Sequence, residues 1–228
     1  MEEHKRQVLS FVRRMGRVRK TQQYALENYW DDWVQKSTDG PFEYDKKQQS
    51  ALVLEIGFGM GQSLIVMAKA HPDTHYIGVE VHRPGIGALL HHAVKEDLKN
   101  LSVYAEDVHD VLHHALADHS LDGVQIFFPD PWPKKRHHKR RLVQEGFASL
   151  LAQKVKRGGF LHIATDWQPY ADDMLEMLNK HTCWQNRAQD GGFCKDAPGQ
   201  REETKFEKRG QDRAHAINDL YFINQATR

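Results

Sequence analysis

Five short apolar runs between residues 51 and 165 alternate with stretches in which apolar residues recur at helical spacing. Each run has the length and composition of a buried strand. Strands are expected at 51–57, 75–81, 101–107, 124–128 and 160–165. Helices are expected after them, at 62–70, 86–98, 108–117, 142–155 and 170–179. Because strands that alternate with helices pair in parallel, the pattern predicts an α/β fold with a doubly wound, Rossmann-like sheet.

The N-terminal segment precedes this alternation. We expect residues 1–49 to form a basic arm, one helix and a linker, and residues 50–228 to form the main domain. Thr21 is a candidate N-cap for the helix. The apolar face of this helix is expected to carry Leu26, Tyr29, Trp30, Trp33 and Val34.

The C-terminal tail follows the last predicted helix. Its runs TKFEKRG (204–210) and AINDLYFINQA (216–226) are typical of strands. We expect them to form an antiparallel hairpin at one edge of a sheet that is otherwise mostly parallel.

Composition and charge limit the possible classes of protein. The net charge is +1, from 32 basic and 31 acidic residues, so overall charge does not indicate a nucleic-acid ligand. Basic residues are nevertheless clustered: residues 1–20 hold seven Lys or Arg against two Glu. Cys183 and Cys194 form no C-x-x-C pair, which suits a reducing compartment. Since no apolar segment has the length of a signal-peptide core or a membrane span, we expect a cytoplasmic protein without a membrane partner.

An acidic side chain stands at the carboxyl end of each predicted strand. In chain order these residues are Glu55, Glu80, the pair Glu106 and Asp107, Asp130, and Asp166. Ligands of doubly wound sheets bind outside the carboxyl ends of the strands. We therefore expect the acids to surround one binding pocket.

A glycine loop follows the first strand at Gly57, Gly59 and Gly61. Its G-x-G-x-G spacing differs from the G-x-G-x-x-G that places a pyrophosphate on a helix N-terminus. The loop alone is weak support, because sharp turns need glycine anyway. Glu80, however, suits a pair of ribose hydroxyls, and carboxylates favour a ligand with a sulfonium and an amine over one with phosphates. The pattern predicts S-adenosyl-L-methionine rather than NAD as cofactor.

The stretch 124–141, VQIFFPDPWPKKRHHKRR, joins the fourth strand to a dense cluster of cations. Three prolines stop the strand, since they fit neither a helix nor a ladder of hydrogen bonds. They hold Asp130 and Trp132 on a stiff backbone. The eight residues from Lys134 to Arg141 are all Lys, Arg or His, and we expect them to contact phosphates rather than to form only a solvated helix start.

These motifs resemble one known family. The segments LEIGFGMG, IGVEVHRPGIG, FFPDPWPKKRHHKRR, ATDW and TKFEKRG are similar, in this order, to those of the bacterial tRNA (guanine-N7)-methyltransferases, and the match runs from about Phe11 to Phe222. The resemblance implies a class I methyltransferase that uses S-adenosyl-L-methionine. It implies that the enzyme methylates N7 of a guanine in the tRNA variable loop, guanine 46, to give 7-methylguanosine.

The resemblance also implies roles for particular residues. Cofactor-pocket positions are Glu55, Glu80, Asp107 and Asp130, and Asp130 is also the catalytic position. Substrate-binding positions are Lys134, Asp166 and the run Thr204, Lys205, Phe206 and Glu207. The RNA-contacting segment is Arg136, His137, His138, Lys139, Arg140 and Arg141.

The chemistry of guanine N7 suggests a mechanism. N7 has a lone pair and no proton, so its methylation requires no general base. We expect Asp130 to place the base and offset the positive charge that develops on it. Asp166 and Glu207 are candidates to accept hydrogen bonds from the guanine N1–H and amino group. Trp132 is expected either to stack on a base or sugar or to pack in the core.

Three other classes remain open at this point. A nicotinamide-dependent oxidoreductase would share the sheet, and an amino-group methyltransferase also places a proline–aromatic motif after the fourth strand. The third is an RNA-binding protein without catalytic activity on the same fold. Fifteen histidines do not indicate a metal, because they lack a third ligand at zinc spacing. The expected assembly is a monomer or homodimer bound to tRNA.

Overall fold

The computed structural model describes residues 16–196 and 216–226. The strands are β1 (Val34–Gln35), β2 (Ala51–Ile56), β3 (Thr74–Val79), β4 (Leu101–Tyr104), β5 (Leu121–Phe127), β6 (Val155–Thr165), β7 (Trp184–Asn186) and β8 (Asn218–Asn224). The helices are α1 (Lys20–Asn28), α2 (Trp30–Trp33), α3 (Gln62–Ala70), α4 (Arg83–Lys95), α5 (Val108–Asp110), α6 (Glu145–Lys154) and α7 (Gln168–Lys180). Shorter segments are the 3-10 helices η1 (Ser37–Asp39) and η3 (Lys135–Arg140) and the π-helical turn η2 (Val111–Ala115).

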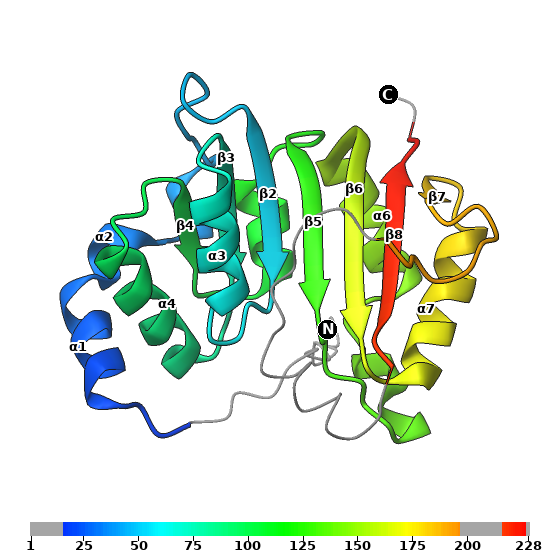
Figure 1. The fold of residues 1–228 in the computed structure, drawn as a ribbon, viewed down its shortest axis with the longest axis horizontal. Helices are drawn as coiled ribbons and strands as arrows, with labels where there is room; N and C mark the ends of the chain where they lie inside the picture. Colours follow the sequence, from blue (N-terminus) through cyan, green and yellow to red (C-terminus); the bar gives the residue numbers. More distant parts are fainter. Residues whose placement is uncertain (1–15, 197–215, 227–228) are drawn as a thin grey trace, which may run out of the picture.

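Within the described residues the strands form one sheet in the order β1-β4-β3-β2-β5-β6-β8-β7 (Figure 1). Neighbours from β1 to β6 are parallel, whereas β8 is antiparallel to both β6 and β7. The five predicted strands and the α/β class are therefore confirmed. Strands β2, β3 and β5 are buried along nearly their whole length, as their apolar runs indicate.

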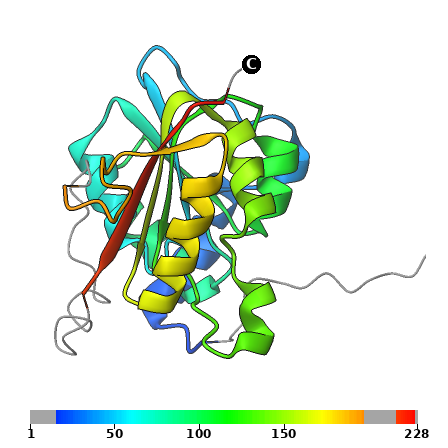
Figure 2. The same cartoon turned by 90° about the vertical axis from the view of Figure 1, so that its right-hand side faces the viewer.

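Two apolar layers cover the sheet. Helices α1, α3 and α4 lie on one face, where Leu64, Ile86 and Leu89 belong to the same apolar cluster as Val53 of β2. Helices α6 and α7 with the α5–η2 segment lie on the other face (Figure 2). Burial of each large aliphatic side chain contributes about 1.5–3 kcal/mol, so these layers hold the strand ends in fixed positions around the site.

Several boundaries differ from the prediction. Thr21 lies inside α1, which begins after Arg19, whose backbone N–H donates to Oε1 of Gln22 (2.8 Å). The N-terminal helix breaks at Tyr29, and Val34 belongs to β1, which pairs with β4. The described part of the N-terminal segment thus packs on the sheet, and a division of the chain at residue 49 stays a prediction.

The boundaries of the helix predicted at 142–155 differ because the first and last residues of its apolar stripe belong to neighbouring segments. Leu142 and Val143 precede α6, and Val155 begins β6 rather than ending the helix. The helix predicted at 108–117 is a single turn followed by a wider π-helical turn. The predicted strand at 204–210 lies outside the described residues, and β8 instead pairs with β6 and the short β7.

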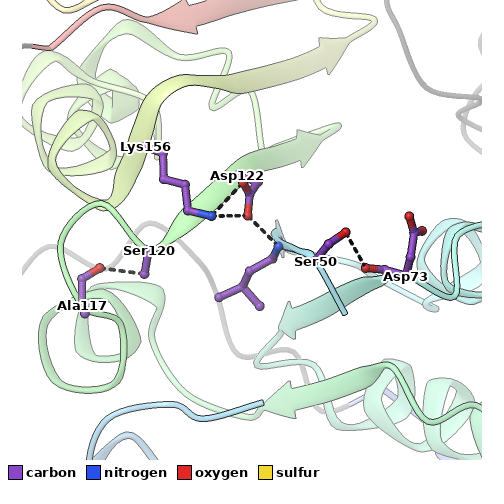
Figure 3. A network of polar contacts seen from close by, with 7 residues as sticks. Ser50, Asp73, Ala117, Ser120, Asp122 and Lys156 are labelled. Carbon is purple, nitrogen blue, oxygen red and sulfur yellow. Dashed lines mark hydrogen bonds and ion pairs between the residues drawn. The ribbon is translucent and has the colours of Figure 1, made fainter. Parts of the chain in front are cut away.

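A polar network holds together the amino ends of the central strands (Figure 3). Asp122 of β5 accepts hydrogen bonds from the backbone N–H of Leu52 in β2 and from Nζ of Lys156 in β6, each at 2.8 Å. Nearby, the hydroxyl of Ser50 donates to the carbonyl of Asp73 (3.4 Å). The network fixes β2, β5 and β6 at the end opposite the predicted pocket.

Candidate active site

The glycine loop between β2 and α3 has the conformation that only glycine adopts readily. Gly57, Gly59 and Gly61 have φ values of +74°, +58° and +74°. The N–H of Gly57 donates to the carbonyl of Val79 (2.8 Å), and the N–H of Gly59 donates to Oε2 of Glu80 (2.9 Å). The loop is therefore attached to the end of β3, and a Cβ at Gly57 or Gly59 would meet open space.

Helix α4 approaches this loop so closely that it requires a glycine of its own. A Cβ at Gly85 would lie 1.9 Å from the carbonyl oxygen of Gly59. Sequence reasoning gave Gly85 no role, since its importance depends on a contact between segments far apart in the chain.

Replacing Gly85 with Ala should therefore displace the glycine loop. We expect a loss of about 1–3 kcal/mol in the free energy of unfolding and clearly weaker binding of any ligand held by the loop. Urea unfolding and calorimetric titration measure the two effects. Gly146→Ala in α6 is the matched control, because its Cβ meets nothing within 4 Å and should stabilise the helix by up to about 1 kcal/mol. If Gly85→Ala and Gly146→Ala had the same free energy of unfolding and the same ligand affinity, the close contact between α4 and the glycine loop would not matter as we propose.

A cavity of about 260 Å³ opens at the carboxyl ends of β2, β3, β4 and β5, at the lower ends of these arrows in Figure 1. It is lined by Ile56, Gly57, Gly59, Val79, Glu80, Val81, Glu106, Asp107, Val108, Ile126, Phe127, Phe128, Pro129, Asp130 and Leu142. The structure thus brings together three of the predicted cofactor acids, Glu80, Asp107 and Asp130, with two of the three loop glycines. The apolar side chains beside these acids suit a ligand that is part aromatic and part charged.

Backbone groups hold the acids of this cavity in place. Oε1 of Glu80 accepts from the N–H groups of Val81 (2.7 Å) and His82 (3.0 Å), and its Oε2 accepts from the N–H of Gly59. Oδ1 of Asp107 caps α5 by accepting from the N–H of His109 (2.9 Å). Ionised carboxylates have about four acceptor positions, so both side chains keep positions for a ligand.

Glu55 lies on β2, directly before the cavity-lining Ile56, but it does not line the cavity itself and is only 2% exposed. Burial, with a smaller contribution from the charge of Glu80, raises the pKa of Glu55 to about 8. Among the described residues, its Oε2 has no hydrogen-bond partner, and neither does Oε1 of Gln125, the residue paired with it on β5. Two adjacent strands thus each place one buried side-chain oxygen without a described partner near their carboxyl ends. Sequence reasoning missed Gln125, because it lies within an apolar run.

The proline segment after β5 carries Asp130 into solvent at the mouth of the cavity. Phe128 and Trp132, each followed by a proline, have positive φ values of 53° and 44°. Bulky residues adopt this region at a cost of about 1–3 kcal/mol, and such strain is typical of functional segments.

The basic cluster forms η3 and has two sides. Lys134, Arg136 and Lys139 are exposed. His137 and Arg140 instead contact the half-buried ring of Trp132, edge-to-face at 5.8 Å and through a cation–π contact at 5.1 Å. Trp132 therefore packs against the basic segment rather than in the core, and its stacking on a base or sugar stays a prediction. Desolvation, followed by the nearby cations, lowers the pKa of His137.

Arg141 differs from the rest of the cluster because it is 5% exposed. The charge run predicted an RNA contact at this position, but the side chain faces Tyr170 and Asp173 of α7. Its neighbour His138 is half-buried and contacts its guanidinium.

The remaining predicted residues lie at or beyond the end of β6. Asp166 follows this strand directly and is half-buried, but it does not line the cavity. Thr204, Lys205, Phe206 and Glu207 lie outside the described residues. Among the residues that are described, no three His, Cys, Asp or Glu side chains gather into a possible metal site. No helix of the described ranges has the length and apolarity needed to cross a membrane.

Comparisons with known proteins agree with this geometry. A family model described as "Putative methyltransferase" matches residues 49–220. In shape, the chain is similar to the 16S rRNA methyltransferase KamB (TM-score 0.57, 14% identity, 79% of this chain and 91% of that one). It is also similar to the antibiotic-resistance methyltransferase Kmr (TM-score 0.54, 14% identity, 80% and 91%). The fold and the pocket define a class I methyltransferase.

The sequence relatives narrow this class. The chain is 49% identical over 223 residues to the tRNA (guanine-N(7)-)-methyltransferase of Pseudomonas fluorescens (strain SBW25), covering 97% of this chain and 92% of the relative. It is 48% identical over 220 residues to the enzyme of the same name from Stutzerimonas stutzeri (strain A1501), covering 96% and 92%. The chain belongs to the tRNA (guanine-N(7)-)-methyltransferase family.

Proposed function

We propose that the protein transfers a methyl group from S-adenosyl-L-methionine to N7 of a guanine in tRNA. The observation that carries this proposal is the cavity at the strand ends, which Glu80, Asp107 and Asp130 line together. Relatives that match nearly the full length bear the name of this activity. The proposed target within tRNA is guanine 46 of the variable loop, and the proposed compartment is the cytoplasm, where tRNA is abundant.

The residues of the cavity fit S-adenosyl-L-methionine. Its amine is a suitable donor for Oε2 of Glu55 and Oε1 of Gln125, which do not line the cavity but stand next to its lining residues Ile56 and Ile126 and have no partner among the described residues. Glu80 keeps an acceptor position for a ribose hydroxyl, and the open space at Gly57 and Gly59 lets the backbone approach the ligand. When bound, this cofactor supplies a methyl group on a positively charged sulfur.

The chain's part in the reaction is to position the base and to offset charge. Guanine N7 needs no deprotonation, so no side chain has to act as a base. The purine gains a positive charge as its N7–methyl bond forms, and the carboxylate of Asp130 at the cavity mouth stabilises that charge. Its place on a proline-stiffened segment limits reorganisation during the reaction.

Two carboxylates near the carboxyl ends of the strands are proposed to select guanine over adenine. Guanine presents N1–H and an amino group, and two acceptors that face them would reject adenine. Asp166, at the end of the strand next to β5, is proposed as one acceptor. Glu207 is proposed as the other on the basis of its motif alone.

The exposed cations of η3 are proposed to contact tRNA phosphates. Replacing both Arg136 and Lys139 with Ala should weaken tRNA binding by about tenfold at moderate salt and reduce the slope of log affinity against log salt by about 1.5–2. Filter binding at several salt concentrations measures both. Lys99→Ala is the control, since Lys99 is exposed just before β4 and pairs with the exposed Asp97, and its removal should leave the slope unchanged. An unchanged slope in the double variant would contradict the phosphate contacts.

The target position can be tested with altered substrates. Unmodified tRNA should accept methyl groups, whereas the same tRNA with adenine in place of guanine 46 should not. Methylation of both to the same extent would disprove the position and keep the methyltransferase.

A further inference from the structure

The side chain of Arg141 contacts four described residues, and these contacts connect the proline segment to α7. Its Nε donates to the carbonyl of Pro131 (2.9 Å), and its Nη1 pairs with Oδ2 of Asp173. Nη2 lies 3.1 Å from Nε2 of His138, which accepts in the tautomer protonated on Nδ1. The guanidinium carbon lies 4.5 Å from the centre of the Tyr170 ring. With 5% exposure and its donors directed inward, Arg141 is not placed to reach a phosphate.

The carbonyl that Arg141 holds belongs to the residue directly after Asp130. Prolines at 129, 131 and 133 leave only two backbone N–H groups between Pro129 and Pro133 for hydrogen bonding. The strained backbone at Phe128 and Trp132 persists only where its surroundings hold it. The hydrogen bond from the Arg141 guanidinium to the carbonyl of Pro131 stabilises this backbone from outside the segment.

Through α7, Arg141 is also connected to the region of Asp166. Tyr170 is buried, and its hydroxyl accepts from the backbone N–H of Val143 (3.0 Å), so the chain on both sides of Arg141 is attached to α7. The same helix begins at Gln168, two residues after Asp166. Arg141 therefore links the segment that carries Asp130 to the helix that starts beside Asp166.

We propose that Arg141 is a positioning residue that sets the place of the Asp130 carboxylate relative to Asp166, and that it does not bind RNA. This role rests on the proposed function, in which both carboxylates face the guanine. A Lys at this position keeps the charge beside Asp173 but has no planar fork to reach Pro131 and His138 together. Misplacement of a catalytic group by about 1 Å costs on the order of 100-fold in rate.

The test separates kcat from KM in Arg141→Lys. We expect kcat for tRNA methylation to fall by about 30- to 100-fold, with KM for tRNA within about twofold and the salt slope of tRNA binding unchanged. In Arg141→Ala, ethylguanidinium should restore part of kcat, and ethylammonium of equal charge should not. Rescue of the rate is a result that a general loss of stability does not produce.

Two results would overturn the proposal. A raised KM and a lower salt slope at unchanged kcat would make Arg141 a phosphate contact. A loss of kcat that neither cation rescues, with a matching fall in the midpoint of thermal unfolding, would make its role structural only. The wild-type chain in the same assay separates a failure of the proposed function from a failure of the positioning role. If the wild type did not methylate tRNA, both proposals would be overturned; if it did, only the role of Arg141 would be in question.

Discussion

Replacing Asp130 with Asn should lower kcat for tRNA methylation by about 100- to 1000-fold, the usual effect of removing one preorganised electrostatic group. Asn keeps the size of the side chain and loses the negative charge that offsets the cation developing on guanine. Because Asp130 is exposed, the free energy of unfolding should change by no more than about 0.5 kcal/mol. Single-turnover kinetics with saturating cofactor and tRNA isolates the methyl-transfer step from binding.

Asp97→Asn is the matched control for this variant. Asp97 is exposed near the amino end of β4, and Asn tolerates its positive φ of 52°. We expect this variant to retain the wild-type kcat. If Asp130→Asn also retained it, electrostatic stabilisation by Asp130 would be disproved.

Replacing Glu55 with Gln should change stability and cofactor binding in opposite directions. Since the folded-state pKa of Glu55 is raised to about 8 from 4.5, the wild-type chain is most stable below pH 4.5 with respect to this group. It loses that contribution, on the order of 5 kcal/mol, as pH rises from 4.5 through 8. A neutral Gln cannot ionise, so the stability of the variant relative to wild type should rise by several kcal/mol between pH 5 and pH 8. Urea unfolding at both pH values measures the difference.

The same variant should bind S-adenosyl-L-methionine about 10- to 100-fold more weakly, because a charged hydrogen bond is lost. In the wild type, a cationic amine favours the ionised form of Glu55, so binding at pH 7 should release a proton, and affinity should increase as pH rises toward 8. Titration calorimetry in buffers of different ionisation enthalpy counts that proton. Glu55→Gln should release none at this site, and equal release by both proteins would show that Glu55 does not titrate on binding.

The sequence predicted those parts of the fold that depend on runs of apolar residues. Strands β2 to β6 are long enough to show such runs, whereas β1 and β7 have two and three residues and depend on their partners β4 and β8. Residue 155 illustrates the limit: Val155 continues the apolar stripe of α6, yet pairing with Leu121 makes it the first residue of β6. Helical periodicity contains no information about a strand partner that lies more than thirty residues away in the sequence.

The residues of the site likewise divide into those that could be predicted from the sequence and those that could not. Carboxylates at strand ends could be predicted, because parallel strands bring their carboxyl ends to one edge of the sheet. The burial of Arg141 could not, since in sequence it is one cation among eight and its partners Tyr170 and Asp173 lie about thirty residues further on. Gly85 was missed for a similar reason, because only the packing of α4 on the glycine loop reveals why a Cβ cannot be present.

The most direct test of the account is to incubate the purified protein with methyl-labelled S-adenosyl-L-methionine and unmodified tRNA. Borohydride reduction and aniline cleavage then map any 7-methylguanosine. The account predicts label in the tRNA and cleavage at a single guanine of the variable loop. Label without an aniline-sensitive site would contradict the N7 target, and a protein that does not bind the labelled cofactor would contradict the central claim itself.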